Sequence, residues 1–418
     1  MKNYGRLKAA CYTSNISMAV VTNLPPVLFL TFREMYGISY SLLGLLVLIN
    51  FVTQLIVDLL FSFFSHRFNL TKVVKLTPVI TVLGLLTFTL LPYVFPRQVY
   101  LCLMLGTLIY SASAGFVEVL ISPVIAAIPS DNPDREMSKL HSVYAWGVVG
   151  VIAVATLYIL CFGRKNWQFL MLGMTVIPSI SALLFWKSEI PKMETPTQIT
   201  GVRKQLRNKV LWCSVIAIFL GGAAECTMAQ WASGYLESSM GIDKVWGDLC
   251  GVAMFALMLG LGRTWYAQKG KRIGPVLVCG AIGASVCYMV AALTPFPMVG
   301  LLACGLTGLC VSMLWPGNLI AAAERMPAGG VFLYAMMAAG GDLGASVGPQ
   351  LVGSLTDFAM ENPTLMSLAE TLKMSPEQFG MRMGILVGAI FPLIAIPLYL
   401  HIKKTTEGRK HLLETTVG

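Results

Sequence analysis

Charge is scarce in this 418-residue chain. Only 12% of the residues are charged, whereas 56% are hydrophobic, and the mean hydropathy is strongly positive. A soluble protein of this length could not cover so much apolar surface with so few charged side chains. The composition therefore excludes a soluble protein and indicates a polytopic membrane protein.

Motifs for catalysis and metal binding are also missing. The ten cysteines never form a C-x-x-C pair, and the four histidines show no ligand spacing, so we expect neither disulfides nor a metal site. The sequence contains no recognisable phosphate-binding loop, nucleophile-base pair or soluble sensory domain. We therefore expect no cofactor, and we expect neither an enzyme nor a receptor.

What the sequence does contain is long apolar runs. Crossing a bilayer as a helix takes about 20 apolar residues, and all the runs are too continuously apolar for the alternation of a porin-type barrel. The first run contains Pro25-Pro26 and has no small-residue cleavage pattern, so we interpret it as a span rather than a signal peptide. The twelve runs lie near residues 10–31, 40–64, 73–95, 99–128, 140–162, 167–186, 210–236, 246–267, 274–294, 297–322, 331–357 and 381–402. The predicted fold class is an all-α membrane protein with twelve transmembrane helices.

The basic residues predict the orientation. If the N-terminus is cytoplasmic, 22 of the 30 basic residues fall in cytoplasmic segments and only seven in outer ones. The positive-inside rule then places both termini in the cytoplasm of a cell that carries the protein in its plasma or inner membrane. This topology also explains the net charge of +10 without a nucleic-acid partner.

The chain reads as two halves. A polar, basic segment at 187–209 separates six spans in 1–186 from six spans in 210–418. LISPVI at 120–125 matches MLWPGNL at 313–319, and Gly147-x-x-Gly150 then matches Gly341-x-x-Gly344 at a similar offset. Parallel six-span repeats of this kind enclose a site near the bilayer midplane and rock about it.

These features together resemble the major facilitator superfamily, over essentially the whole chain. SFFSHRFNLTKVV at 62–74 keeps Arg67 and Lys72 of the family's signature loop but lacks its glycine and aspartate, while GRTWYAQKGKRIGPVL at 262–277 keeps Arg263. The resemblance implies a gate role for Arg67 and Arg263. Glu118, WPGN in the tenth span and the glycine-rich eleventh span are most similar to the fucose permease-like sugar:proton symporters. Their first-span acid has no match here, where Asn15 and Asn23 stand instead.

Four carboxylates lie inside the predicted spans and more than five residues from either end, namely Asp58, Glu118, Glu225 and Asp342. Each costs at least about 2.5 kcal/mol if it is charged at mid-span, so each needs a reason. Glu118 shares its helical face with small and polar residues that would line water or substrate, and Glu225 shares its face with small residues that allow another helix close by. We expect these two acids to act in ion coupling or substrate binding, the alternative being a structural acid with satisfied hydrogen bonds.

For the other two acids, a structural or gate role is at least as well supported as a role in coupling or substrate binding. Asp342 lies in GGDLGASVGP, where tight helix packing explains it as well as a coupling or substrate-binding role does. Asp58 lies near the cytoplasmic end of its span, where we expect a gate or a structural hydrogen bond.

Amide, imidazole and aromatic side chains suited to a hydroxylated ligand are available in the spans. A break at Gly221-Gly222 is one way in which Gln230 and Trp231 could turn towards the Glu225 face. The candidate substrate contacts are Asn15, Asn23, Asn50, Gln54, His141, Tyr144, Trp146, Gln230, Trp231, Trp315 and Asn318. Outside the spans, Ser375-Pro376-Glu377-Gln378 predicts a capped helix start in an outer segment.

The sequence thus predicts a secondary active transporter for a small polar organic solute, a sugar or a related compound, that works by proton symport and alternating access. A membrane acid that takes up a proton in one facing state and releases it in the other is what such a carrier needs. Sodium is the alternative coupling ion. The competing function is a proton-coupled drug or metabolite exporter of the same fold, which the 23 methionines would suit as an adaptable cavity lining. The expected partners are the solute, the ion and the lipid bilayer, and we expect a monomer.

Overall fold

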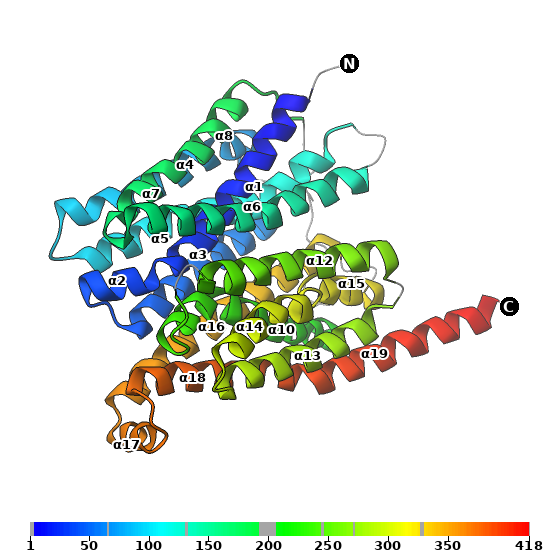
Figure 1. The fold of residues 1–418 in the computed structure, drawn as a ribbon. Helices are drawn as coiled ribbons and strands as arrows, with labels where there is room; N and C mark the ends of the chain where they lie inside the picture. The colour runs from blue at the N-terminus through cyan, green and yellow to red at the C-terminus, as the bar shows by residue number, and fades with distance from the viewer. Residues whose placement is uncertain are drawn as a thin grey trace. The chain divides into compact units, whose positions relative to one another are not determined.

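Every regular element that the structure describes is helical (Figure 1). The structure is a computed structural model that describes residues 4–64, 67–129, 133–191, 206–243, 246–270, 272–326 and 330–417. The predicted all-α class is confirmed for these residues. The chain forms two compact units, residues 1–198 and 199–418, and each is described by itself.

The N-terminal unit is built from spans that are mostly single helices. Pro25 and Pro26 lie in the last turn of the first helix, after which the chain bends by 48° into the second. Asn69 caps the start of the fourth helix, because its side chain accepts a hydrogen bond from the Lys72 backbone N–H at 3.1 Å. The helices are α1 (Gly5–Val27), α2 (Phe29–Tyr36), α3 (Tyr40–Phe64), α4 (Leu70–Val94), α5 (Val99–Ala126), α6 (Pro133–Phe162), a 3-10 turn (Arg164–Asn166), α7 (Trp167–Met174) and α8 (Val176–Trp186).

The C-terminal unit contains further irregular spans. A π-helical segment (Gly247–Ala253) leads into α12, and the tenth predicted span is broken after Val311, with Pro316 restarting the helix at its first turn. Proline is favoured there because its missing N–H would have no helical partner. The helices are α10 (Lys209–Ser238), α12 (Met254–Lys269), α13 (Ile273–Leu293), α14 (Pro297–Val311), α15 (Pro316–Arg325), α16 (Gly330–Glu361), α17 (Pro363–Thr371), α18 (Pro376–Gly388) and α19 (Ile390–Val417).

The predicted spans coincide with these elements, either as one helix or as two that meet at a break. Among the described residues, nine segments are long and apolar enough to cross a membrane, and ten if α1 and α2 form one span. The two that fall short have local reasons. The helix α12 has only 16 residues after its π-helical start, and α16 carries the polar and glycine-rich GGDLGASVGPQ.

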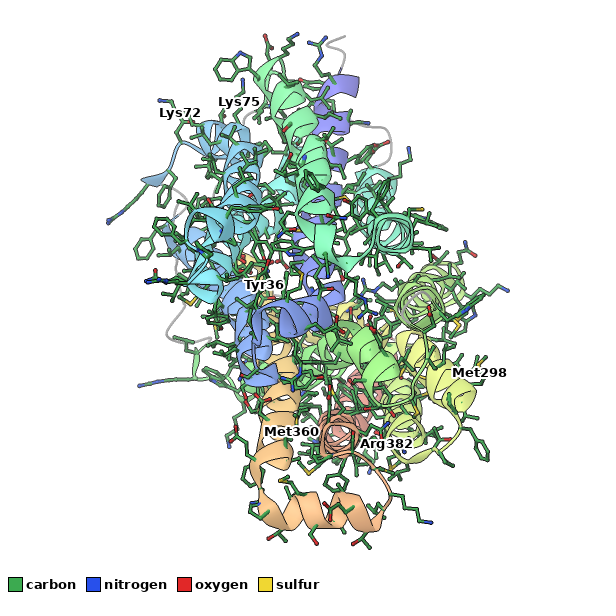
Figure 2. The ribbon with its side chains drawn as sticks, turned by 60° about the vertical axis from the view of Figure 1, so that its left-hand side comes forward. Tyr36, Lys72, Lys75, Met298, Met360 and Arg382 are labelled. Atoms are coloured by element: carbon green, nitrogen blue, oxygen red, sulfur yellow. The ribbon has the colours of Figure 1, made fainter. Side chains whose placement is uncertain are left out.

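The elbow between α16 and α18 is a short helix, α17, which lies across their ends in Figure 1. The predicted cap is confirmed, because Ser375 Oγ accepts from the Gln378 N–H at 3.1 Å and Gln378 Oε1 accepts from the Ser375 N–H at 3.2 Å. Figure 2 shows Met360 near the end of α16 and Arg382 on α18. Arg382 donates to the Thr294 carbonyl at 3.0 Å, which ties α18 to the end of α13.

Each unit has its own buried core. In the N-terminal unit a cluster including Cys11, Val57, Val117, Ile121 and Phe185 joins α1, α3, α5 and α8. In the C-terminal unit a cluster including Leu211, Ile218, Ala322 and Met337 joins α10, α15 and α16. The helices α10 and α16 approach so closely that a Cβ at Gly344 would collide with the Phe219 carbonyl oxygen. Small residues give this close approach in membrane helices.

Candidate functional site

In the C-terminal unit, Glu225 is paired with Arg263. One guanidinium nitrogen, Nη2, donates to both carboxylate oxygens of Glu225, at 2.9 and 3.3 Å. Arg263 Nε also donates to the Ser312 carbonyl at 3.1 Å. Ser312 lies in the break between α14 and α15, where backbone carbonyls lose their helical partners. A single guanidinium therefore joins α10, α12 and the broken span.

The charge balance explains how Glu225 is tolerated in an apolar helix. Its side chain is only 14% exposed and that of Arg263 is 34% exposed. Removing an ion from water is costly, and a well-oriented counter-charge with hydrogen bonds offsets that cost. The sequence predicted both residues as functional, in separate roles, and missed their pairing because they lie on different helices.

Two glycines interlock α10 with α16 beside this pair. A Cβ at Gly222 would lie 2.6 Å from the Gly341 carbonyl oxygen and 3.0 Å from the ring of Trp315, which also covers Gly341. Asp342 follows directly and is buried, at 2% exposure. The helix α10 runs unbroken through Gly221-Gly222, so the break considered there is wrong, and these glycines serve close packing instead.

The remaining C-terminal candidates are buried beside this interface. Trp231 donates its indole N–H to the Pro349 carbonyl at 2.8 Å, and Asn318 Nδ2 donates to the Tyr399 hydroxyl at 3.0 Å and to the Ala217 carbonyl at 3.2 Å. Within the described residues, neither Gln230 Oε1 nor Asn318 Oδ1 has a hydrogen-bond partner. Both oxygens are therefore able to accept a hydrogen bond from a further donor.

In the N-terminal unit, the acid beside Glu118 is Asp58. Their carboxylate oxygens lie within 4.8 Å of one another, although Asp58 is on α3 and Glu118 is on α5. A Cβ at Gly115, one turn before Glu118, would lie 2.9 Å from the Val57 Cβ, so the two helices approach closely at this level. The sequence assigned Asp58 to a gate apart from Glu118, whereas the structure brings the two acids together.

Amides continue this polar strip along α3. Ser111 Oγ on α5 donates to Asn50 Oδ1 at 2.6 Å, and Gln54 Nε2 donates to the Asn50 carbonyl at 3.5 Å. Asn50 and Gln54 are buried, and the apolar cluster around Val57 and Val117 flanks the acids. From the sequence, the polar face of Glu118 and the candidate contacts Asn50 and Gln54 were predicted separately. Helix packing brings α3 and α5 together at these residues.

The candidates on α1 and α6 are linked by hydrogen bonds between these two helices. Asn15 Nδ2 donates to the Leu140 carbonyl at 2.8 Å, and Asn23 Nδ2 donates to the Tyr144 hydroxyl at 3.4 Å and to its own helix at the Ala19 carbonyl. His141 falls on α6, but its side chain lies outside the described set.

Several basic residues of the N-terminal unit lie near the ends of its helices. Arg67 is exposed after α3, with its guanidinium 5.6 Å from the Phe64 ring centroid. Figure 2 shows Lys72 and Lys75 projecting from the start of α4. Near the start of α6, Glu136 forms ion pairs with Lys8 at 2.9 Å and with Lys139 at 3.3 Å. These partners, Lys8 first, lower the pKa of Glu136.

The two acid sites have different chemical capacities. Two carboxylates that share a site cannot both be ionised without a like-charge penalty, whereas a carboxylate bonded to arginine is stable as an anion. The site in the N-terminal unit is therefore suited to holding a proton, and the site in the C-terminal unit is suited to exchanging one ionic partner for another.

Comparison with known families decides the classification. The model of the Major Facilitator Superfamily matches residues 10–349. The chain belongs to the major facilitator superfamily. The fold prediction made from the sequence is thereby confirmed, and this major facilitator protein is a multi-pass membrane transporter.

Solved structures of other transporters share the fold of this major facilitator chain. The nucleoside transporter NupG is 13% identical with a TM-score of 0.70, over 96% of this chain and 99% of that one. The fucose:proton symporter FucP of E. coli is 14% identical with a TM-score of 0.63, over 96% and 99%. A D-xylose-proton symporter is 15% identical with a TM-score of 0.66, over 94% and 98%. A comparison with curated protein sequences finds no match.

Proposed function

We propose that this transporter carries a small polar organic solute, a sugar or a related compound, across the cell membrane by proton symport. The observation that carries the proposal is the Asp58–Glu118 pair, whose carboxylate oxygens lie within 4.8 Å of each other beside the apolar cluster of the N-terminal unit. In the alternating-access cycle that we propose, residues 1–186 and 210–418 rock as two halves about the linker 187–209, with both termini in the cytoplasm.

The coupling step proposed for this pair is a simple proton balance. In one facing state the pair holds one proton between two carboxylates, because the like charges oppose full ionisation. Uptake of a second proton from the outer side makes both groups neutral, and its release on the inner side restores the singly protonated pair. The membrane potential contributes about 2.3 kcal/mol per charge for each 100 mV. Sodium in place of the second proton is the alternative that the test must separate.

The Glu225–Arg263 pair is proposed as the element that responds to the solute. The Arg263 guanidinium donates both to the Glu225 carboxylate on α10 and to the Ser312 carbonyl in the break of the tenth span. A solute that offers acceptor oxygens to Arg263, or donors to Glu225, competes with this arrangement and releases α10 from the α14–α15 break. Broken spans of this kind bind substrates and ions in transporters.

The proposed solute class follows from the polar groups near both pairs. Asn50, Gln54 and Gln230 are buried amides, and amides bind sugar hydroxyls with donor and acceptor together. Trp315 supplies a large ring between α10 and α16, of the kind on which the apolar face of a sugar stacks. Transporters of fucose, D-xylose and nucleosides share this fold, so the fold can carry a polar solute of the proposed class.

The proposal is tested by thermal unfolding of the purified protein with sugars, nucleosides, organic acids and lipophilic cations, at acidic and at neutral pH. A solute at one hundred times its dissociation constant adds about 2.7 kcal/mol of stability. We expect a polar solute to stabilise the wild type in a pH-dependent manner, and Glu118→Gln to lose the pH dependence. Glu370→Gln, an exposed acid in the outer elbow, is the matched control.

Three results would contradict parts of this proposal. Stabilisation by lipophilic cations alone would favour the exporter. Stabilisation that depends on sodium and not on pH would mean that sodium, and not the proton, is the coupling ion. An unchanged pH dependence in Glu118→Gln would remove the acid pair from the coupling step.

A further inference from the structure

An apolar groove of about 800 Å³ lies between α1, α6 and α8 of the N-terminal unit. We call it the α1–α6–α8 groove. Its α6 wall follows helical spacing, so one stripe of that helix faces the groove. Tyr144, which bonds to Asn23, lies on another face of α6. The residues that define the groove are Ile16, Val143, Trp146, Gly150, Val154 and Ile177.

The groove is hollow because α6 has glycine where a side chain would fill it. Nothing lies within 4 Å of a Cβ built at Gly150, whereas at Gly147 such a Cβ would pack 3.3 Å from the Ala19 Cβ. Gly147 therefore lets α6 approach α1, and Gly150 leaves open space one turn further on. Trp146 is 66% exposed and Val154 is 52% exposed, so the groove is open along one side.

The groove lies at membrane depth. Residues Ser142–Phe162 of α6 and Arg164–Trp186 are candidate spans, so this apolar groove lies at the depth of the lipid hydrocarbon. An unfilled groove loses dispersion contacts along its whole lining. An acyl chain, which is flexible and apolar, restores these contacts, whereas a hydroxylated solute does not.

Basic side chains surround the end of the groove that the sequence predicts to be cytoplasmic. Lys139 lines the groove itself and is 48% exposed, while Glu136 stands between it and Lys8. Arg6 donates to the Lys187 carbonyl at 3.3 Å, which links the start of α1 to the end of α8. Among the side chains that the structure describes at this end, the charged ones are Arg6, Lys8, Lys139 and Lys187 against Glu136 and Glu189. The excess is positive, and basic pockets between spans on the cytoplasmic side attract anionic headgroups.

We propose that the α1–α6–α8 groove binds one anionic phospholipid, with its phosphate at the Lys139 ammonium and an acyl chain along Val143, Gly150 and Val154. The lipid fills the space left by Gly150 and so stabilises the packing of α1, α6 and α8. The site is separate from the acid pairs, and the proposal does not depend on which solute is transported.

The test is native mass spectrometry of the full chain in detergent, titrated with phosphatidylglycerol and with phosphatidylethanolamine of the same acyl chains. We expect tighter binding of one phosphatidylglycerol. Gly150→Leu adds a side chain to the groove at a position where a Cβ meets nothing within 4 Å. We expect it to weaken binding of this lipid about tenfold, the effect of losing about two buried methylene contacts. Gly260→Leu on α12 is the matched control, because a Cβ there also meets nothing within 4 Å.

Charge variants test the headgroup end. Lys139→Gln should weaken phosphatidylglycerol binding about fivefold, since one basic residue near an anionic headgroup has an effect of this size. Phosphatidylethanolamine binding should weaken less, because its own ammonium group offsets the charge of its phosphate. Lys72→Gln, an exposed lysine on α4, is its control. Glu136→Gln should strengthen phosphatidylglycerol binding, because it frees Lys8 and Lys139 for the phosphate. If Glu136→Gln only damaged the end of the helix, phosphatidylglycerol binding should weaken instead.

Two results would overturn the proposal. Equal phosphatidylglycerol binding in Gly150→Leu and Gly260→Leu would place the lipid elsewhere on the protein. Equal affinity for both lipids in the wild type would remove the headgroup contact. Fluorescence quenching by phosphatidylglycerol with brominated chains gives a second readout: we expect the quenched fraction to fall in Trp146→Phe, and no change would contradict the proposed chain position.

Discussion

The two units place different neighbours beside an acid in a membrane-spanning helix. In the C-terminal unit, Glu225 has an arginine beside it and can remain ionised. In the N-terminal unit, Glu118 has a second acid, Asp58, beside it. A counter-ion lowers the cost of the charge itself, whereas a neighbouring acid raises that cost and favours a bound proton. From this difference we propose that the N-terminal unit couples transport to the proton, and that the Glu225–Arg263 pair of the C-terminal unit responds to the solute.

The largest effect should come from breaking the C-terminal pair on one side only. Arg263→Gln leaves a buried carboxylate without its counter-ion and should reduce the free energy of unfolding by about 3 kcal/mol, since removing one partner of a buried pair is strongly destabilising. Transport should be lost as well. Denaturant titration of the purified protein measures the stability change.

A double-mutant cycle sharpens this result. Glu225→Gln with Arg263→Gln removes both charges, so the double variant should be more stable than Arg263→Gln alone. If the two single changes simply add, the pair contributes nothing as a unit and the C-terminal half of the comparison fails.

Glu118→Gln should have a large effect on coupling and a small one on stability. An amide resembles a protonated carboxyl in shape and charge, so we expect the free energy of unfolding to change by less than about 1 kcal/mol. Uptake against a gradient driven by a proton gradient should be lost, while exchange of labelled for unlabelled solute should persist. Glu225→Gln is the contrast, because it should impair both. Loss of exchange in Glu118→Gln would show that this acid binds solute rather than the coupling proton.

Close helix packing can be compared between the units by adding one methyl group. Gly344→Ala pushes a Cβ against backbone, the Phe219 carbonyl, and should cost about 1–3 kcal/mol. Gly115→Ala meets the Val57 Cβ at 2.9 Å, a less severe overlap than the one at Gly344, so a smaller cost is expected. Gly260→Ala, with open space, is the control. Thermal unfolding in one detergent measures all three. Equal midpoints would contradict the close packing described beside the Asp58–Glu118 pair and beside the Glu225–Arg263 pair.

The smallest effect concerns Glu136, outside the predicted spans. Its pKa is lowered in the folded protein by the Lys8 and Lys139 ammonium groups, so its contribution to stability is present above the ordinary glutamate pKa and is lost as pH falls through the folded value. The difference in melting temperature between the wild type and Glu136→Gln should therefore shrink on acidification. A difference that grew at acidic pH would mean that the pairs do not stabilise the fold.

The sequence predicted the helices and the polar faces, and it could not predict which faces meet. Helical spacing indicated that Glu118 and Glu225 point into the protein, because periodicity within one helix is a local property. The partners Asp58 and Arg263 lie on other helices, and only packing decides that choice. The break of the tenth span before Pro316 was not predicted, although proline is typical of the first turn of a helix. The break that was considered, at Gly221-Gly222, is absent, because glycine there lets α10 and α16 approach.

The most direct test of the account is proton movement coupled to solute movement in proteoliposomes that contain a pH-sensitive dye. With no imposed gradient, adding a transported polar solute outside should acidify the interior for the wild type. Glu118→Gln should take up the solute without acidification, and Arg263→Gln should show neither. Acidification that is unchanged in Glu118→Gln, or solute uptake without any proton movement in the wild type, would contradict the assignment of proton coupling to the Asp58–Glu118 pair.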